Sequence, residues 1–319
     1  MAIKAQKDKP IKLDTVDKKI FYYLSVNYRI QRKKLAKLVR ISPQRLNHRI
    51  KQLEKQFLEP YVCLNYPLLN IKSYLILFKS LTETEINTFS DSKNIYYFLR
   101  LVGDYQYLAI VFAENIISFC SEHIPNYIPE VFSLEGFFPD KWNGFDVSVL
   151  KETPKSHRKY ELNSKDYEIL SALAEKPNAS LLDLSTKLHI SRQTLNKRIK
   201  LMEEVDIIQA YRFALNVPKI GLLTYFIHLS CKPSEIENIK DSIRNSKYSG
   251  FLFQSNNHLF FPYIVFNPEQ LFNFLEEIEQ KTGPIIDVSQ NTGNYVVEPV
   301  PKYVRELLRD EQLPIKRFA

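Results

Sequence analysis

Glycine and cysteine are scarce in this sequence of 319 residues, which contains seven glycines and three cysteines. Globular proteins usually contain about 7% glycine. The chain lacks both the G-x-x-x-x-G-K-[ST] loop and the G-x-G-x-x-G loop that bind phosphate groups, which argues against a nucleotide-using enzyme. Cys63, Cys120 and Cys231 lie far apart in apolar stretches, so we expect neither a structural metal site nor a disulfide framework.

Long apolar runs are also missing. The run from Tyr107 to Ala113 falls far short of the roughly 18 residues that a membrane-spanning helix needs. The first ten residues carry charge with no apolar segment behind them, unlike a secretory signal. We therefore expect a cytoplasmic protein with no membrane partner. With 45% hydrophobic residues the chain can form packed cores, and its length predicts two or more domains.

Positive charge is concentrated in two blocks. The net charge is +8, with +11 over residues 1–71 and +4 over residues 153–221, whereas the segments between and after them are acidic. Two separate basic surfaces are typical of a protein that contacts a polyanion such as nucleic acid. The alternative at this point is a chance distribution of charge over solvated faces.

The sequence contains an internal duplication. Shifted by 149 residues, the segment 13–54 matches the segment 162–203 at 14 of 42 positions without a gap. The strongest match joins the segment that begins at Ile41 to the one that begins at Ile190. The polar, Pro-containing stretch between the copies is typical of a linker. We therefore expect two copies of a unit of roughly 150 residues, the kind of repeat that decides a fold.

Each copy begins with a pattern of three short helices, the third of which starts at Ser42 or Ser191, two good N-cap residues. In copy one, Leu46, Ile50 and Leu53 form the buried stripe of this helix. The opposite face is basic and amide-bearing, which suits contacts to base edges and phosphates and predicts a helix-turn-helix with a recognition helix. The predicted DNA-binding residues are Gln44, Arg45, Asn47, His48 and Lys51 in copy one, and Gln193, Thr194, Asn196, Lys197 and Lys200 in copy two. Lys33, Lys34 and Lys37 on the preceding helix are predicted to contact phosphate.

The rest of each copy alternates strands and helices in the order β-α-β-β-α-β, a ferredoxin-like unit. In copy one the last strand is expected near residues 146–150, and the extended segments 58–64 and 207–215 are each expected to form a small wing. The predicted fold is α+β, with two winged helix-turn-helix domains alternating with two ferredoxin-like domains. The expected segments are a basic tail (1–12), winged helix-turn-helix one (13–66), ferredoxin-like domain one (67–152), linker (153–161), winged helix-turn-helix two (162–217), ferredoxin-like domain two (218–300) and a C-terminal extension (301–319).

These residues resemble the Lrp/AsnC family of leucine-responsive and asparagine-synthase regulators. The resemblance lies in Leu13-Asp-x-x-Asp17-x-x-Ile20, Ile41-Ser-Pro43 and Arg49-Ile50-x-x-Leu53-Glu54, and it returns in copy two at Leu162, Asp166, Ile190-Ser191 and Arg198-Ile199-x-x-Met202-Glu203, followed by Ile208-Gln-Ala-Tyr211. It implies a transcription regulator that binds double-stranded DNA and whose ferredoxin-like domains pair sheet to sheet. Self-association through those domains, or pairing within one chain, is expected from it.

The family also places a Gly-Asp pair in the hairpin between its second and third strands, where many members respond to amino acids. Gly103 and Asp104 resemble that pair, and the resemblance implies that they contact a small-molecule effector. Copy two departs from the pattern, with Asn257 and His258 at the matching positions. A plain hairpin turn explains Gly103 and Asp104 equally well, because both residue types tolerate turn conformations.

Two other function classes stay open. A related family with the same two-part plan resembles sirohaem decarboxylases and uses His and Arg, for which Arg100, His123 and His258 are the candidates here. None of them has a partner at catalytic or ligand spacing in the sequence, so no catalytic residue, cofactor or metal is expected. The third class is an interaction module that does not bind DNA.

Overall fold

The computed structural model describes residues 13–125, 130–134, 141–142, 145–146, 160–215, 222–245, 252–265, 267–282, 285–298 and 300–310. The chain divides into two compact units that each contain parts of both copies. One, here the barrel unit, comprises residues 72–148 and 217–298 with the first eleven residues. The other, here the helix-turn-helix unit, comprises residues 12–71, 149–216 and 299–319. The basic tail lies outside the described residues, as does the linker up to residue 159.

The helix-turn-helix unit contains two equivalent triplets of helices. Copy one forms α1 (Thr15–Val26), α2 (Arg32–Val39) and α3 (Pro43–Phe57), and copy two forms α6 (Ser164–Glu175), α7 (Leu181–Lys187) and α8 (Arg192–Glu204). Ser42 and Ser191 begin the third helices as predicted, and their hydroxyls accept hydrogen bonds from the backbone N–H groups of Arg45 and Thr194. The short third helices are thus fixed at their N-termini by the caps that the sequence specifies.

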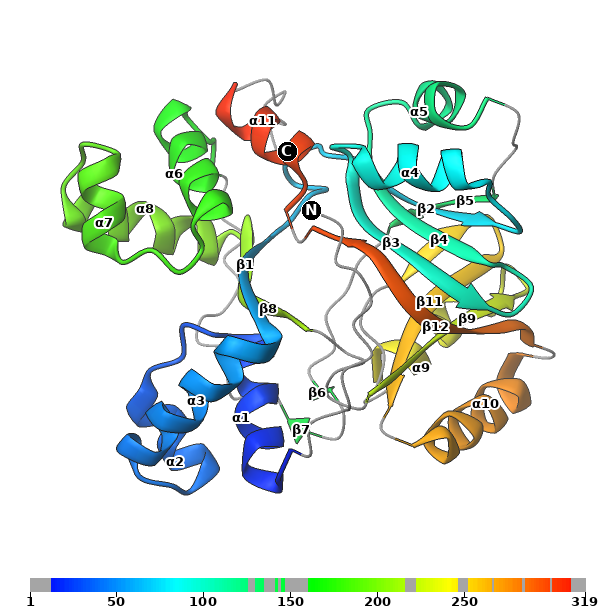
Figure 1. Ribbon diagram of the computed structural model, residues 1–319, viewed down its shortest axis with the longest axis horizontal. Helices are drawn as coiled ribbons and strands as arrows, with labels where there is room; N and C mark the ends of the chain where they lie inside the picture. Colours follow the sequence, from blue (N-terminus) through cyan, green and yellow to red (C-terminus); the bar gives the residue numbers. More distant parts are fainter. Residues whose placement is uncertain are drawn as a thin grey trace. The chain divides into compact units, whose positions relative to one another are not determined.

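The two triplets are joined by a strand pair that the sequence does not reveal. Strand β1 (Leu58–Leu64) pairs antiparallel with β8 (Ile208–Leu215), so that these segments form one ribbon between the copies rather than a wing within each copy. In Figure 1 the blue and green helix triplets flank this ribbon. Val62 pairs with Tyr211, its own equivalent after a shift of 149 residues. Within the helix-turn-helix unit a pseudo-twofold axis therefore passes between these two residues and relates the two helix triplets.

The second unit is a closed barrel of eight strands in the order β10-β11-β9-β12-β3-β4-β2-β5. Copy one supplies β2 (Ser73–Phe78), β3 (Ile95–Val102), β4 (Tyr107–Phe112) and β5 (Glu130–Leu134), and copy two supplies β9 (Leu223–Ser230), β10 (Phe253–Ser255), β11 (His258–Val265) and β12 (Ile285–Val297). Within each copy the spatial order is that of a ferredoxin-like sheet, with the first and third strands in the middle. The barrel closes where β12 pairs with β3 and β10 pairs with β5.

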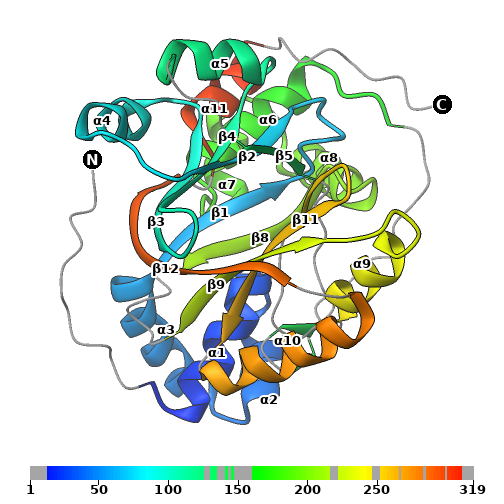
Figure 2. The ribbon, with the colours of Figure 1, turned by 90° about the vertical axis from the view of Figure 1, so that its right-hand side faces the viewer.

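Helices cover the outside of the barrel and aromatic rings fill much of its interior. The helices are α4 (Glu83–Asp91) and α5 (Ile116–His123) on copy one, and α9 (Ile236–Asn245) and α10 (Pro268–Thr282) on copy two (Figure 2). Alternate residues such as Phe78 and Phe261 face these helices. Phe132 of copy one packs on Phe260 of copy two with ring centroids 5.7 Å apart, so both copies contribute to one interior.

The fourth strand of copy one differs from its prediction. We expected it near residues 146–150, but residues 130–134 form the strand β5, which pairs with β2. Within 146–150 only Asp146 is described, and it belongs to the two-residue strand β7 (Phe145–Asp146), which pairs with β6 (Lys141–Trp142). Periodicity favoured 146–150 because Asp146-Val-Ser-Val-Leu150 alternates polar and apolar residues at its start, whereas Glu130-Val-Phe-Ser-Leu134 has two adjacent apolar residues that break the alternation.

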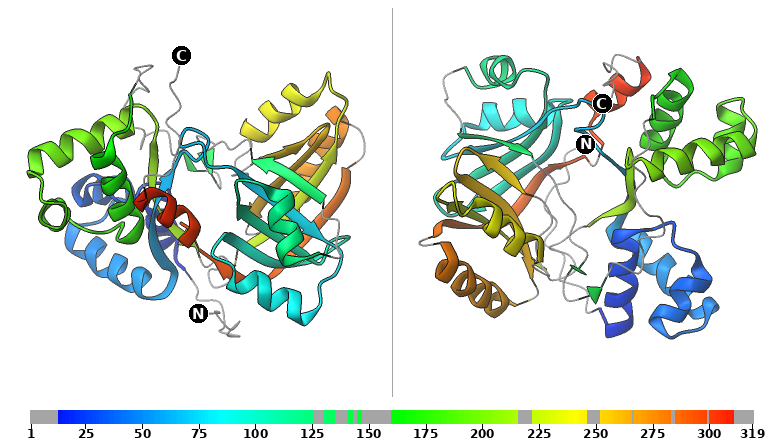
Figure 3. Two further views of the ribbon diagram at one scale, coloured as in Figure 1. Left: turned by 90° about the horizontal axis from the view of Figure 1, so that it is seen from above. Right: turned by 180° about the vertical axis from the view of Figure 1, so that it is seen from behind.

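Helix α11 (Lys302–Arg309) occurs in the predicted C-terminal extension and packs against α6 in the helix-turn-helix unit (Figure 3). Val304 and Leu308 are buried along one side of α11. This short helix is amphipathic, as expected for a segment that adds to an existing core. Residues 311–319 lie outside the described part of the chain.

Candidate nucleic-acid interface

Helix α3 presents the polar face that the sequence predicts. Leu46, Ile50 and Leu53 are buried. The five predicted DNA-binding residues of copy one, Gln44, Arg45, Asn47, His48 and Lys51, are all exposed. Two cationic side chains, an imidazole and two amides therefore lie on one solvent-facing surface, where they can reach base edges or phosphates.

Helix α8 presents an equivalent face that differs from that of α3 in the burial of its asparagine and in the contact made by Thr194. Gln193, Thr194, Lys197 and Lys200 are exposed and Asn196 is half-buried. The hydroxyl of Thr194 lies 2.9 Å from the hydroxyl of the capping residue Ser191. One polar group of Thr194 is therefore already engaged within the protein, and its methyl group is the part most available for a base contact.

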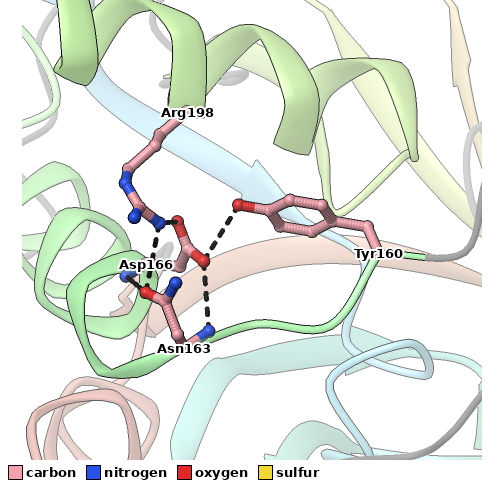
Figure 4. Close-up of polar contacts among 4 residues, drawn as sticks. All are labelled: Tyr160, Asn163, Asp166 and Arg198. Carbon is pink, nitrogen blue, oxygen red and sulfur yellow. Dashed lines mark hydrogen bonds and ion pairs between the residues drawn. The ribbon is translucent and has the colours of Figure 1, made fainter.

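Each recognition helix is held against the first helix of its copy by an arginine that the sequence pattern did not single out for this role. Arg198 donates from Nη1 to Asp166 at 2.9 Å and to Asn163 at 3.1 Å (Figure 4). Asp166 is fully buried, and its second carboxylate oxygen accepts hydrogen bonds from the Tyr160 hydroxyl and the Asn163 backbone N–H. Burial, together with the bond to Asp166, raises the pKa of Tyr160 to about 12, so this hydroxyl stays a donor.

Copy one contains the equivalent contact in a more exposed form. Arg49 donates to Asp17 at 2.6 Å and to Asp14 at 2.7 Å. Hydrogen bonds from the Asp17 backbone N–H and from Arg49 lower the pKa of Asp14. Arg49 and Arg198 belong to the motif that supports the family resemblance, and the contacts give a physical reason for it: they fix the angle of the recognition helix.

The three lysines predicted to contact phosphate are not equivalent. Lys33 and Lys37 on α2 are exposed, whereas Lys34 is half-buried. The two exposed ammonium groups can approach a phosphate without rearrangement. Lys34 is the weakest of the three candidates on this ground.

A set of aromatic and cationic contacts joins the copies beside the β1–β8 ribbon. The Tyr28 hydroxyl and the Arg29 guanidinium both donate to the Pro177 carbonyl, and Pro177 is the equivalent of Tyr28 after the shift of 149 residues. Arg29 also lies 3.8 Å above the centre of the Tyr211 ring. Burial raises the pKa of both Tyr28 and Tyr211. Sequence reasoning missed the contacts of Tyr28 and Arg29 with Pro177, since only the pairing of the copies brings these residues together.

Gly103, predicted as an effector residue, lies in the β3–β4 turn against strand β12. It has a φ of +155°, and a Cβ at this position would collide with the hydroxyl of Ser289 and approach its Cα to 3.0 Å. Only glycine fits this backbone and this approach. Asp104 beside it is exposed. The packing requirement accounts for Gly103 without an effector, and nothing in the described residues tests an effector role for either residue.

The candidates for an enzymatic site have different surroundings. Arg100 is exposed on β3, and Nδ1 of His123 donates a hydrogen bond to the Phe119 carbonyl while its ring stacks on that of Phe119 with centroids 4.1 Å apart. His258 does have a partner, contrary to the sequence analysis: its Nδ1 lies 3.2 Å from Nε2 of His228. The pair was missed because its members are 30 residues apart and meet only when β9 and β11 pair.

The described residues contain neither a metal-binding cluster nor a membrane-spanning helix. No group of three or more His, Cys, Asp and Glu side chains with the geometry to hold a metal ion occurs in the part of the chain that the structure describes. None of the described helices combines the length and apolar character needed to cross a membrane.

Comparison with known proteins assigns both helix triplets to one family of DNA-binding domains. The family model for winged helix-turn-helix DNA-binding domains matches residues 13–56 and again 162–209. An uncharacterized HTH-type transcriptional regulator of Pyrococcus furiosus is 32% identical over 89 residues, 28% of this chain and 60% of that protein. The HTH-type transcriptional regulator LrpA of Pyrococcus horikoshii is 24% identical over 96 residues, 30% of this chain and 68% of that protein. The match thus spans about 60% of the length of the first of these relatives.

One solved structure matches almost the whole chain. The crystal structure of the siroheme decarboxylase NirDL aligns with 93% of this chain and 98% of its own, with a TM-score of 0.57 and 14% sequence identity. At this identity the likeness shows a shared fold of two helix-turn-helix and two ferredoxin-like domains. The family match therefore shows two winged helix-turn-helix DNA-binding domains, and the structure combines them with two ferredoxin-like domains in one polypeptide that is similar in part to Lrp-type transcriptional regulators.

Proposed function

We propose that this protein is a transcription regulator that binds double-stranded DNA in a sequence-specific manner. The observation that supports it is the pair of exposed, carboxylate-free faces on α3 and α8, held in one unit by the β1–β8 ribbon. Solvated helix faces usually mix both signs of charge, whereas these faces are cationic and amide-bearing over their first three turns. Such a regulator works in the cytoplasm.

One chain supplies two recognition helices and therefore reads two half-sites. In a homodimer the two helices are identical and the operator is a palindrome. Here the shared residues are Gln44 and Gln193, Asn47 and Asn196, and Lys51 and Lys200, but Arg45 is replaced by Thr194 and His48 by Lys197. The operator is an imperfect inverted repeat: its two half-sites have the same base pairs where the shared residues contact them, and different base pairs where the residues that differ contact them.

Selection of bound duplexes from a random pool with the purified chain tests this function. The expected result is an inverted repeat, retained on a DNA column with an affinity that falls as salt rises. A variant with Gln44, Asn47 and Lys51 all changed to Ala keeps the buried stripe and serves as the specificity control. Absence of any enriched sequence with the unchanged chain would reject sequence-specific binding.

An amino acid or similar small molecule modulates binding in this proposal, by analogy with the family. The region implied by the resemblance is the turn at Gly103 and Asp104. Addition of each amino acid during the DNA-binding measurement tests it, with Asp104→Ala as the variant expected to lose the response. An unchanged response in Asp104→Ala would remove this residue from the effector site.

A decarboxylase acting on a sirohaem-like substrate is the second candidate, favoured only by the fold match along 93% of the chain. Arg100 is exposed and His123 is satisfied by Phe119, so neither resembles a prepared catalytic group. Tetrapyrrole absorbance on the purified protein, measured beside its retention on DNA, separates the two functions. Tight tetrapyrrole binding without DNA binding would favour the enzyme.

A further inference from the structure

Two histidines meet in the part of the barrel that copy two contributes. Nε2 of His228 on β9 lies 3.2 Å from Nδ1 of His258, the first residue of β11. His228 is 3% exposed, whereas His258 is half-buried and connects the pair with solvent. A buried imidazole that faces a second imidazole is a different chemical environment from that of His123, which contacts a backbone carbonyl.

The separation of the two nitrogens fits a shared metal ion as well as it fits a hydrogen bond. Zinc binds imidazole nitrogen at about 2.0–2.1 Å in a tetrahedral arrangement, which places two such nitrogens roughly 3.3–3.4 Å apart. The observed distance of 3.2 Å between Nε2 of His228 and Nδ1 of His258 is close to this value. An ion held there would replace the hydrogen-bonding proton between the two nitrogens and would need both of them unprotonated.

The surroundings favour a small cation. Asp287 on β12 is the direct cross-strand partner of His228, so a carboxylate lies on the strand next to the imidazole. The Ser289 hydroxyl donates to this carboxylate, which fixes its orientation as partners of metal-site groups commonly do. The ring centroids of Phe132, Phe260 and Tyr105 lie 5.5, 6.1 and 6.3 Å from that of His228, so three aromatic rings surround this buried imidazole, an environment in which a small ion fits more readily than a planar macrocycle.

The pair is specific to copy two. The strand registers make Lys79 the equivalent of His228 and Asp104 the equivalent of His258. A Lys and an Asp cannot replace two imidazoles as ligands of a transition metal ion. The turn that carries Gly103 and Asp104 in copy one has therefore been replaced in copy two by a turn that presents a histidine to a neighbouring histidine.

We propose that His228 and His258 bind one divalent transition cation of the zinc type. The two imidazoles are the protein ligands, water occupies the remaining positions, and Asp287 supplies nearby negative charge. Because no third ligand of metal-binding geometry occurs among the described residues, the ion is exchangeable. The site is independent of the proposed DNA-binding function and lies in the barrel unit.

Cobalt titration of the untagged, chelator-treated full chain tests the site, because Co²⁺ bound to imidazole nitrogen absorbs visible light and zinc displaces it. We expect one zinc-displaceable cobalt per chain, and a loss of affinity of at least about tenfold in His258→Gln, since even outer-shell changes cost 10–100-fold. His123→Gln is the matched control and should bind as the unchanged chain does. Proton NMR of the unchanged chain adds a readout without mutation, in which zinc should shift the His228 and His258 resonances and spare His123.

Two results would overturn the proposal. One is cobalt binding that His258→Gln does not weaken, or that His123→Gln weakens equally. The other is an NMR titration in which zinc leaves both imidazoles unchanged while pH shifts them together, which would show a simple hydrogen-bonded pair. An iron porphyrin that binds through His258 when zinc does not would replace the small ion with a macrocycle and would also reject the site as proposed.

Discussion

Replacing Arg45 by Thr should make the two recognition helices alike at the position where they differ most in chemistry. Arg45 is exposed on α3, and its guanidinium can donate two hydrogen bonds to one guanine. Thr194, the equivalent residue on α8, has its hydroxyl next to that of Ser191. In one half-site Arg45 therefore makes a bidentate contact with a guanine, whereas in the other half-site Thr194 contacts a base with its methyl group.

The magnitude follows from the value of one bidentate base contact, about 1–3 kcal/mol of discrimination. At 1.4 kcal/mol per tenfold change, Arg45→Thr should lower the preference for guanine at one position of the operator by roughly 5- to 150-fold. Preferences under Gln44 and Asn47 should be unchanged, because neither residue is altered. Thr194→Arg should have the opposite effect and add a guanine preference to the other half-site.

The assay is selection from a random duplex pool with the unchanged chain, the two single variants and the exchanged pair Arg45→Thr with Thr194→Arg. A cleavage reagent attached to an engineered surface cysteine on α2 reports which half-site copy one occupies. The exchange should reverse this orientation on the same operator. A perfectly symmetric site, or an orientation indifferent to the exchange, would show that these side chains do not reach the bases or that the two copies bind different duplexes.

Four further predictions concern other parts of the structure. Lys33→Gln and Lys37→Gln should each weaken binding to all sequences alike and reduce the salt slope by about 0.9, while Lys232→Gln in the barrel unit should leave the slope unchanged. Gly103→Ala should destabilise the barrel by about 1–3 kcal/mol in a denaturant titration, because the backbone has a positive φ there and the new Cβ would collide with Ser289. Gly293→Ala is the control and should not destabilise it, because a Cβ at that position would have no other atom within 4 Å. Asp166→Asn should cost about 1–3 kcal/mol of unfolding free energy, because it weakens the hydrogen bonds of a buried carboxylate while Arg198 keeps access to solvent. The more exposed Asp17→Asn should cost clearly less, and equal costs would refute the assigned role of burial. Hydrogen bonds lower the pKa of Asp14, so its contribution to stability is fully present above the ordinary pKa of 3.8 and is lost as the pH falls through the lowered value. Asp14→Asn removes this contribution, and its thermal stability should therefore fall less steeply in acid than that of the unchanged chain.

The parts of the fold that depend on neighbouring residues could be predicted from the sequence. Helices α3 and α8 begin where Ser42 and Ser191 cap them, and their buried stripes contain Leu46 and Leu195 as the helical period requires. The strand β9 lies within a run of mostly apolar residues that ends just before Lys232 and Pro233. Caps, period and chain breakers act over a few residues, which is why they can be read from a sequence.

The pairings between copies could not be predicted in this way. The segments 58–64 and 208–215 are extended in either interpretation, and only the partner strand distinguishes a wing from a ribbon. The same is true of His258, whose partner is 30 residues away, and of Tyr28, which meets Pro177. Each of these contacts is set by which strands pair, a choice made by the packing of whole domains.

The duplication gives a physical reason for where the copies agree and where they differ. On the pseudo-twofold axis a residue meets its own equivalent, as Val62 meets Tyr211, so the two copies must complement each other there. Away from the axis a homodimer would impose every substitution twice, whereas one chain with two copies can change each position alone. The recognition helices differ at Arg45 and Thr194, and the barrel turns differ at Asp104 and His258. At such positions one copy can acquire a contact that the other lacks, and these differences coincide with the proposed DNA-reading residue and with the proposed cation site.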